Sequence, residues 1–273
     1  MLRRKTWQYI ALASEDAFVS AAVAHLGYVG LAFATAYDRR TGIEASFQRL
    51  APFAQGFRVA PELASGETVF TCSQGELRFS NLPRRVVIDV PGFEVTAELA
   101  GGAPWPCAWP IGPKGRNETV KDMGVECRGT LLLGSRERSL DGHAMVDWTR
   151  GTPARRTAWR WAAGVASVGD RRLAWNLRTG FDDPDQVENA LWVDGQPVPP
   201  GLATITPGSP GTPWRITAGA LDLSFEPDGM RREDLNLGLV ASRYQQPWGR
   251  YHGTFEGQLL SGYGVVEDHW AIW

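Results

Sequence analysis

Short runs in which apolar and polar residues alternate recur along this chain of 273 residues. Residues 84–99, RRVVIDVPGFEVTAEL, contain two such runs on either side of Pro91 and Gly92, and residues 67–83 break in the same way at Gly75. Similar runs occupy residues 171–181, 189–198, 214–227 and 249–260. A period of two predicts strands, because successive side chains of a strand point to opposite faces. Glycines and prolines separate the runs and no long helical periodicity occurs, so the pattern predicts an all-β sandwich or barrel.

One apolar run is long enough to suggest a different structure. Residues 17–37, AFVSAAVAHLGYVGLAFATAY, approach the ~20 residues that a membrane-spanning helix needs. The run contains His25, Ser and Thr residues and two glycines, and charged residues flank it on both sides. We therefore predict two strands with a turn at Gly27, and a membrane span is the alternative.

Two stretches rich in proline and glycine, residues 100–124 and 197–213, predict loops. The first lies near the middle of the chain and is the better candidate for a domain joint. We predict an N-terminal β domain at residues 1–125 and a C-terminal β domain at residues 126–273, each of ordinary domain size. No internal repeat is visible, so this division depends on the positions of the loops alone.

Charge and cysteine content narrow the classes of function. Lys and Arg total 28 and Asp and Glu total 30, a balance that produces no field to attract nucleic acid or an anionic membrane. Cys72, Cys107 and Cys127 form no CxxC pair, which favours reduced thiols over a zinc ribbon or a disulfide framework. The N-terminal residues MLRRKTWQYIAL lack the apolar core and the cleavage site of a signal peptide. These features predict a cytoplasmic protein with no nucleic-acid partner and no stable membrane insertion.

Twelve tryptophans are the unusual feature of the composition, and most of them lie from Trp148 onward. Each indole covers a large area and carries an N–H group that needs an acceptor. So many indoles predict either a cavity lined by aromatic rings or barrel ends packed with them.

Five segments together resemble a bacterial domain family of unknown function, numbered 2804. They are KTWQYIALASEDAFVSAAVAHLGYVGLAFATAYDRRTG, GHAMVDWTRGTPARRTAWRWAAG, ENALWVDG, PWGRYHGTF and GVVEDHWAIW, which extend the resemblance over about residues 5 to 273. That family is similar, at a distance, to the carotenoid 1,2-hydratase and AttH-like proteins. The resemblance implies two lipocalin-like (calycin-type) β-barrel or sandwich halves. The distant relatives add water to isolated alkenes or guide cyclisation of polyenes and terpenoids.

The segment GHAMVDWTRG, residues 142–151, is the nearest equivalent of a His-Asp-His-x-Trp-Gly motif in the carotenoid hydratases. His143, Asp147 and Trp148 keep the residue types, but the spacing differs and the second histidine is absent. On an extended strand His143 and Asp147 share a face, where an acid and an imidazole could exchange a proton. The indole of Trp148 could then stabilise a carbocation. The alternative is a tight bend in which Asp147 turns the chain, Trp148 fills the core and His143 lies in solvent.

The C-terminal segment EDHWAIW supplies a second candidate. Glu267 and His269 share one face of an extended strand, and Asp268 and Trp270 share the other. His269 is predicted to face the cavity, and the alternative is a histidine at a surface edge.

The segment ENALWVDG, residues 188–195, supplies a third candidate. Glu188 beside Trp192 could be a general acid in an enclosed site. It could equally form a buried structural pair with Arg150 or Arg178.

Further residues complete the prediction. Trp159 and Trp161 share one face and are either sheet core or ligand wall, which coincide in a barrel of the lipocalin type. Tyr251 and His252 point to opposite faces, and His25 is predicted to be a core histidine. The predicted catalytic residues are His143, Asp147, Glu188 and His269. The predicted ligand-binding residues are Trp148, Arg150, Trp159, Trp161, Asn189, Trp192, Tyr251, Asp268 and Trp270.

We therefore predict a protein that binds a hydrophobic, isoprenoid- or polyene-like small molecule in an aromatic-lined β cavity. Acid–base hydration or cyclisation of that molecule, in the manner of a lyase or isomerase without a cofactor, is one outcome. A non-catalytic lipid or pigment carrier on the same fold is the alternative, and a β module with its cavity packed shut is a third. The absence of GxSxG, Walker and HExxH motifs predicts no nucleotide cofactor and no metal site.

Overall fold

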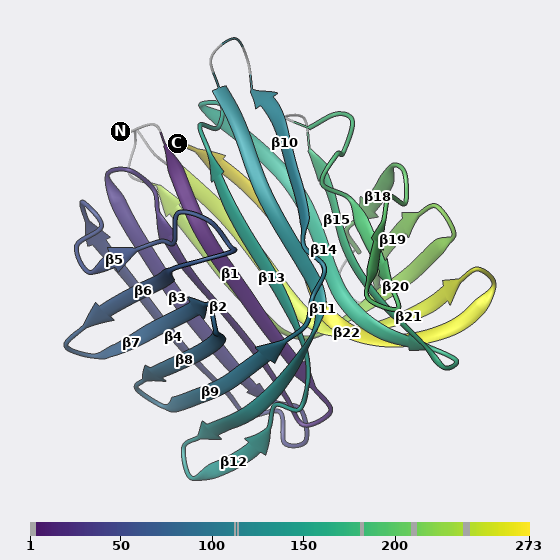
Figure 1. The fold of residues 1–273 in the computed structure, drawn as a ribbon, viewed down its shortest axis with the longest axis horizontal. Coiled ribbons are helices and arrows are strands. Elements are labelled where there is room, and N and C mark those ends of the chain that lie inside the picture. Colours follow the sequence, from purple (N-terminus) through teal and green to yellow (C-terminus); the bar gives the residue numbers. More distant parts are fainter. Residues whose placement is uncertain (1–3, 112, 114, 181–182, 209–211, 237–240) are drawn as a thin grey trace. The chain divides into compact units, whose positions relative to one another are not determined.

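A computed structural model describes residues 4–111, 113, 115–180, 183–208, 212–236 and 241–273 (Figure 1). The described residues form strands, turns and bends and contain no helix, which confirms the predicted all-β class. They divide into two compact units. Unit 1 consists of Met1–Gly102 and Glu118–Thr152, and unit 2 of Ala103–Asn117 and Pro153–Trp273. Each unit has its own buried apolar cluster.

This division differs from the predicted joint between residues 125 and 126, which falls within strand β11 (Gly115–Leu133). The stretch 100–124 was predicted to be a loop, and it instead contains β10 (Trp105–Ile111) and the first half of β11. Strand β10 lies off the main path of its sheet and pairs with β11. Proline lacks an N–H group and is tolerated in a strand at such an edge, so its presence did not exclude a strand here.

Unit 1 is built on the strand order β4-β3-β2-β1-β13-β11-β9-β8-β7-β6-β5, with β12 paired to β11. Its strands are β1 (Lys5–Ser14), β2 (Ala17–His25), β3 (Val29–Asp38), β4 (Glu44–Pro52), β5 (Phe57–Arg58), β6 (Glu67–Cys72), β7 (Gly75–Asn81), β8 (Arg84–Val90), β9 (Phe93–Ala100), β11, β12 (Arg136–Ser139) and β13 (Gly142–Gly151). Alternation places Ile10 and Leu12 of β1, and Val146 and Trp148 of β13, in one apolar cluster.

The hairpins read from the sequence are confirmed. Residues 17–37 form β2 and β3, and Gly27 between them has a φ of 92°, a value that glycine adopts without strain. Gly92, with a φ of 99°, joins β8 to β9 in the same way. No described segment is a helix long and apolar enough to cross a bilayer. The predicted loop at 197–213 was only partly correct, since it contains β18 (Ala203–Thr206).

Unit 2 carries the strand order β17-β16-β15-β14-β22-β21-β20-β19-β18. The strands are β14 (Arg156–Val168), β15 (Arg171–Gly180), β16 (Ala190–Val193), β17 (Gln196–Val198), β18, β19 (Trp214–Ala218), β20 (Leu221–Asn236), β21 (Ala241–Phe255) and β22 (Gln258–Ile272). The four longest, β14, β20, β21 and β22, supply most of the residues discussed below.

Aromatic rings fill the apolar face of unit 2. The ring centroids of Trp175 and Tyr251 lie 4.8 Å apart, and those of Phe225 and Tyr251 lie 4.7 Å apart. Gly164 of β14 makes room for the indole, because a Cβ at this position would lie 2.4 Å from Cζ2 of Trp175. The polar residues discussed below therefore lie mainly on the face of this sheet opposite the apolar cluster.

Candidate functional site

The second face of unit 2, opposite its apolar cluster, gathers aromatic and polar side chains. Trp159 and Trp161 of β14 alternate with the core residue Ala162, and Glu267 and His269 of β22 alternate with the core residue Val266. The antiparallel register places Trp159 opposite His269 and Trp161 opposite Glu267. Strand alternation thus directs all four side chains to the same face.

His269 lies among three aromatic rings. Its ring centroid is 4.3 Å from that of Trp159, 5.2 Å from that of Tyr244 and 6.1 Å from that of Trp273. The interplanar angles of 72°, 88° and 74° are close to edge-to-face geometry. We call these four residues, together with Ser242, Gln246 and Glu267, the His269 cluster.

The two imidazole nitrogens of His269 have different surroundings. Nε2 is 3.0 Å from Oγ of Ser242, and the tautomer decides which of them donates. Nδ1 is buried 4.0 Å from Oε1 of Glu267, beyond hydrogen-bond distance, and has no hydrogen-bond partner among the described residues. Nε2 is therefore held by Ser242, whereas Nδ1 can accept a proton or contact a ligand.

Burial lowers the pKa of His269 from 6.5 to about 3, and the positive charge of Arg231 contributes in the same direction. Arg231 lies over the ring of Tyr244, with Cζ 4.8 Å from the centroid, and pairs with Glu233 at 2.8 Å. The imidazole is consequently neutral at physiological pH, the form that accepts a proton.

Neutral donors hold the carboxylate of Glu267. Trp159 Nε1 donates to Oε1 at 2.7 Å, and Gln246 Nε2 donates to Oε2 at 3.0 Å. Each of the two carboxylate oxygens therefore accepts a hydrogen bond from a side chain of the His269 cluster. Glu267 was not among the predicted site residues, although its spacing of two from His269 was visible in the sequence.

A buried ion-pair network extends this face. Arg178 Nε is 3.1 Å from Oε1 of Glu188, and Arg178 Nη1 is 3.7 Å from Oδ2 of Asp183. The same guanidinium lies over two indoles, with Cζ 5.5 Å from the ring centroid of Trp109 and 5.8 Å from that of Trp159. Of the two partners predicted for Glu188, the structure selects Arg178. This ion pair matches the structural alternative for Glu188 more closely than the role of a general acid.

Asn189, Trp161 and Trp192 are hydrogen-bonded within unit 2. The Asn189 side chain accepts from the backbone N–H of Arg178 at 2.7 Å and donates to Gln186 at 2.7 Å. Trp161 Nε1 donates to Asn176 Oδ1 at 2.7 Å, and Trp192 Nε1 donates to the carbonyl of Ala103 at 2.8 Å. In contrast, Nε1 of the buried Trp109 has no hydrogen-bond partner among the described residues.

Asp147 lies in unit 1, within a network that occupies its carboxylate. Oδ1 accepts from Thr149 Oγ1 at 2.9 Å and lies 2.8 Å from the buried ammonium of Lys121, while Trp7 Nε1 reaches Oδ2 at 3.4 Å. Thr119 is a further donor, at 3.3 Å. These partners hold the Asp147 carboxylate in place on the sheet of unit 1.

The predicted pairing of His143 with Asp147 does not occur as a direct contact. Residues 142–151 form the uninterrupted strand β13, so the tight bend of the alternative does not occur, whereas its prediction that Trp148 fills the core is confirmed. Four residues of strand span about 13 Å, which separates two side chains on one face too far for direct proton exchange. Trp148 points to the opposite face, into the apolar cluster, and its Nε1 donates to the carbonyl of Ala60 at 2.9 Å.

The other predicted residues lie apart from the His269 cluster or at its margin. Arg150 of unit 1 pairs with Glu118 at 2.5 Å. Tyr251 belongs to the apolar cluster of unit 2, where its hydroxyl donates to the carbonyl of Val265 at 2.5 Å and burial raises its pKa well above 10. Asp268 is half-exposed, and its Oδ1 lies 3.7 Å from Nε of Arg160. Trp270 is half-exposed as well, and Cζ of Arg243 lies 5.0 Å from its ring centroid. His25, predicted to be a core histidine, is half-buried and accepts from Gly27 N at 3.2 Å.

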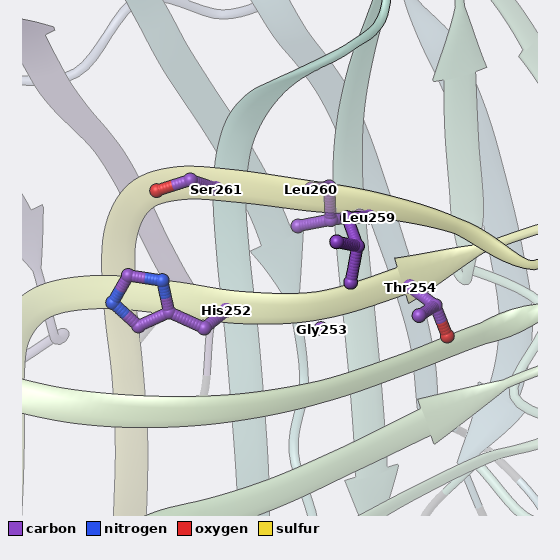
Figure 2. Close-up of a pocket in the computed structure, with 6 residues that line it drawn as sticks. All are labelled: His252, Gly253, Thr254, Leu259, Leu260 and Ser261. Carbon is purple, nitrogen blue, oxygen red and sulfur yellow. The ribbon is translucent and has the colours of Figure 1, made fainter.

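A separate hollow lies on the hairpin of β21 and β22, and its lining residues are His252, Gly253, Thr254, Leu259, Leu260 and Ser261 (Figure 2). It contains no aromatic side chain besides the imidazole of His252, and Leu259 is 83% exposed. None of the predicted site residues lines it. The described residues contain no group of three or more His, Cys, Asp or Glu side chains placed to hold a metal ion.

Comparison with solved structures places this architecture in a known class. An AttH-type protein from Nitrosomonas europaea has a TM-score of 0.60 at 16% identity, over 97% of this chain and 92% of the other. Kievitone hydratase from Nectria haematococca has a TM-score of 0.53 at 13% identity, over 97% and 88%. CghA has a TM-score of 0.56 at 12% identity, over 98% and 87%. At these identities the likeness concerns the fold, which is all-β with two lipocalin-like halves.

The family follows from the sequence itself. The sequence profile of the family described as Domain of unknown function (DUF2804) matches residues 1–273, and the chain belongs to that family. No curated protein matches the chain.

Proposed function

We propose that this protein binds a hydrophobic small molecule of isoprenoid or polyene type at the second face of unit 2, and that His269 accepts a proton from it. The observation that carries this proposal is the neutral imidazole with three aromatic rings around it and one nitrogen without a hydrogen-bond partner. Trp159, Tyr244 and Trp273 are half-buried, so they offer ring surface to an apolar ligand.

The chemistry that suits this arrangement is the deprotonation that ends a dehydration, cyclisation or hydration. A cationic intermediate loses H+, and the electron pair of the broken bond forms a C=C double bond or, in hydration, stays on the oxygen of the added water. Nδ1 of His269 takes the proton, and the carboxylate of Glu267, 4.0 Å away, stabilises the imidazolium that forms. The rings of Trp159 and Tyr244 stabilise positive charge on the substrate. Two proteins that share the fold support the proposal: kievitone hydratase, which is named as a hydratase, and CghA, one of whose structures is described with Sch210972.

A non-catalytic carrier is the second candidate, and the low pKa of His269 favours it. An imidazole with a pKa of about 3 is a weak base at pH 7, which reduces the driving force for proton transfer. Arg178 also engages Glu188 and Asp183, two other acidic groups of this face.

The experiment is native mass spectrometry of the protein purified from its own host, followed by titration with C15 and C20 isoprenoids under tryptophan fluorescence. Trp159→Leu is expected to weaken binding at least tenfold, whereas Trp214→Phe, on the apolar face, leaves it unchanged. His269→Gln retains binding and abolishes conversion if the protein is an enzyme, and a ligand recovered unchanged from the wild type identifies a carrier. Absence of both a copurified ligand and isoprenoid binding would refute the proposal.

A further inference from the structure

The indole N–H group of Trp109 is a buried hydrogen-bond donor in unit 2. Trp109 is 6% exposed, and its Nε1 has no hydrogen-bond partner among the described residues. A buried N–H group has given up its hydrogen bond to water, so leaving it unpaired costs free energy. Buried indoles therefore usually have an acceptor, as Trp159 and Trp161 do at 2.7 Å each. The N–H group of Trp109 needs an explanation for this reason.

Strand β10 fixes the position of this indole. Trp105, Cys107 and Trp109 alternate with exposed residues of the strand. Trp105 Nε1 and Cys107 Sγ both donate to the carbonyl of Val187, at 3.4 Å and 3.2 Å, which holds this side of β10 against the segment that follows β15. Trp109 lies on the same side of the strand, and Cζ of Arg178 lies 5.5 Å from its ring centroid.

Trp109 is close to the His269 cluster. Arg178 pairs with Trp161 across β14 and β15, so both side chains point to the second face of unit 2. Cζ of Arg178 lies 5.5 Å from the ring centroid of Trp109 and 5.8 Å from that of Trp159, and the sum of these distances, 11.3 Å, is the largest separation that the two centroids can have. Trp159 in turn is in edge-to-face contact with His269. A C15 isoprenoid is long enough to contact both indoles.

The N–H group of Trp109 distinguishes between ligands. An indole nitrogen donates and cannot accept, so a ligand satisfies it only with an acceptor such as an oxygen atom. A hydrocarbon polyene has no such atom. Packing against Arg178 does not require the N–H group, because a guanidinium is attracted by the face of the ring, which phenylalanine also offers.

We infer that Trp109 donates a hydrogen bond to an oxygen of the ligand, so that this face selects oxygenated isoprenoids, such as alcohols, ethers and ketones, over hydrocarbons of the same skeleton. This inference rests on the proposed function and adds a substrate class to it. Trp109 is then a residue that determines specificity, and the proton transfer assigned to His269 does not depend on it.

The test compares farnesol, farnesyl methyl ether and the hydrocarbon farnesene, titrated against tryptophan fluorescence. Trp109→Phe keeps an aromatic ring beside Arg178 and removes the N–H group. It is expected to lower the ratio of the ether affinity to the farnesene affinity at least about threefold, the effect of one lost hydrogen bond. Trp214→Phe, the same substitution on the apolar face, leaves this ratio unchanged. Both affinities are measured on one folded sample, so the ratio does not depend on the stability of the variant.

Nuclear magnetic resonance of the protein with isotope-labelled indole nitrogens locates the hydrogen bond. The N–H proton resonance that is missing from Trp109→Phe should move downfield when farnesyl methyl ether binds and not when farnesene binds. Trp109→Tyr takes the place of Trp109→Phe if the latter does not fold. Equal affinity ratios in wild type and variant, or no downfield shift of any indole resonance in the wild type, overturn the inference and leave the proposed function intact. Failure of all three ligands to bind the wild type refutes the proposed function and the inference with it.

Discussion

Acidification from pH 7.5 to pH 5.0 is expected to destabilise this protein through His269. Burial lowers the folded-state pKa of His269 to about 3, whereas the unfolded chain has the ordinary value of 6.5. The folded state therefore binds fewer protons than the unfolded state at any pH between these values. The contribution of His269 to stability is complete above pH 6.5 and is lost progressively as the pH falls towards 3.

The magnitude follows from the two pKa values. One pKa unit corresponds to about 1.4 kcal/mol, so a fall from the unfolded value of 6.5 to pH 5.0 removes about 2 kcal/mol from the free energy of unfolding. Above pH 5.0 most carboxylates remain ionised and contribute little to the change. The effect is a sizeable part of the stability of an ordinary domain.

The assay is urea unfolding followed by tryptophan fluorescence at pH 7.5, 6.5, 5.75 and 5.0, with wild type and His269→Gln measured in parallel. Glutamine keeps a hydrogen-bonding group near Ser242 but does not titrate. The difference in unfolding free energy between the two proteins should change by about 2 kcal/mol across this range. His252→Gln, at an exposed position on β21, serves as the control. Parallel pH profiles for wild type and His269→Gln would show that His269 is not held neutral by the fold, and the reasoning would be refuted.

Three further predictions concern packing, the network in unit 1 and thiol reactivity. Gly164→Ala should lower the free energy of unfolding by about 1–3 kcal/mol, because its Cβ would lie 2.4 Å from Cζ2 of the fully buried Trp175; an unchanged Tm would contradict this. Asp147→Asn should cost about 3–5 kcal/mol by removing the carboxylate 2.8 Å from the buried Lys121 ammonium. The double variant Asp147→Leu/Lys121→Met should recover most of that loss, and additive costs in urea unfolding would argue against the pair. Burial raises the pKa of Cys127 to about 12, so iodoacetamide at pH 8 should modify this thiol only after the protein unfolds. Peptide mass spectrometry maps the alkylated cysteines, and rapid alkylation of Cys127 in the native protein would contradict the prediction.

Several features of the candidate site could be predicted from a single segment of the sequence. The spacing of Glu267 and His269 places both on one face of a strand, and β22 has that geometry. The spacing of Trp159 and Trp161 does the same on β14. Other features could not be predicted from a single segment. For Trp148 the sequence left two roles open, stabilising a carbocation or filling the core, and only the packing of unit 1 decided that its indole belongs to the apolar cluster.

The sequence by itself determined the all-β class, the hairpins at Gly27 and Gly92, and which residues of each strand share a face. These properties are local, because they depend on the period of two and on glycines that adopt a positive φ. The tertiary structure alone decided that Trp159 lies opposite His269, since strand pairing joins residues more than a hundred positions apart. It also decided which face of each strand meets the apolar cluster, because that choice depends on the packing of a whole unit and not on any one segment.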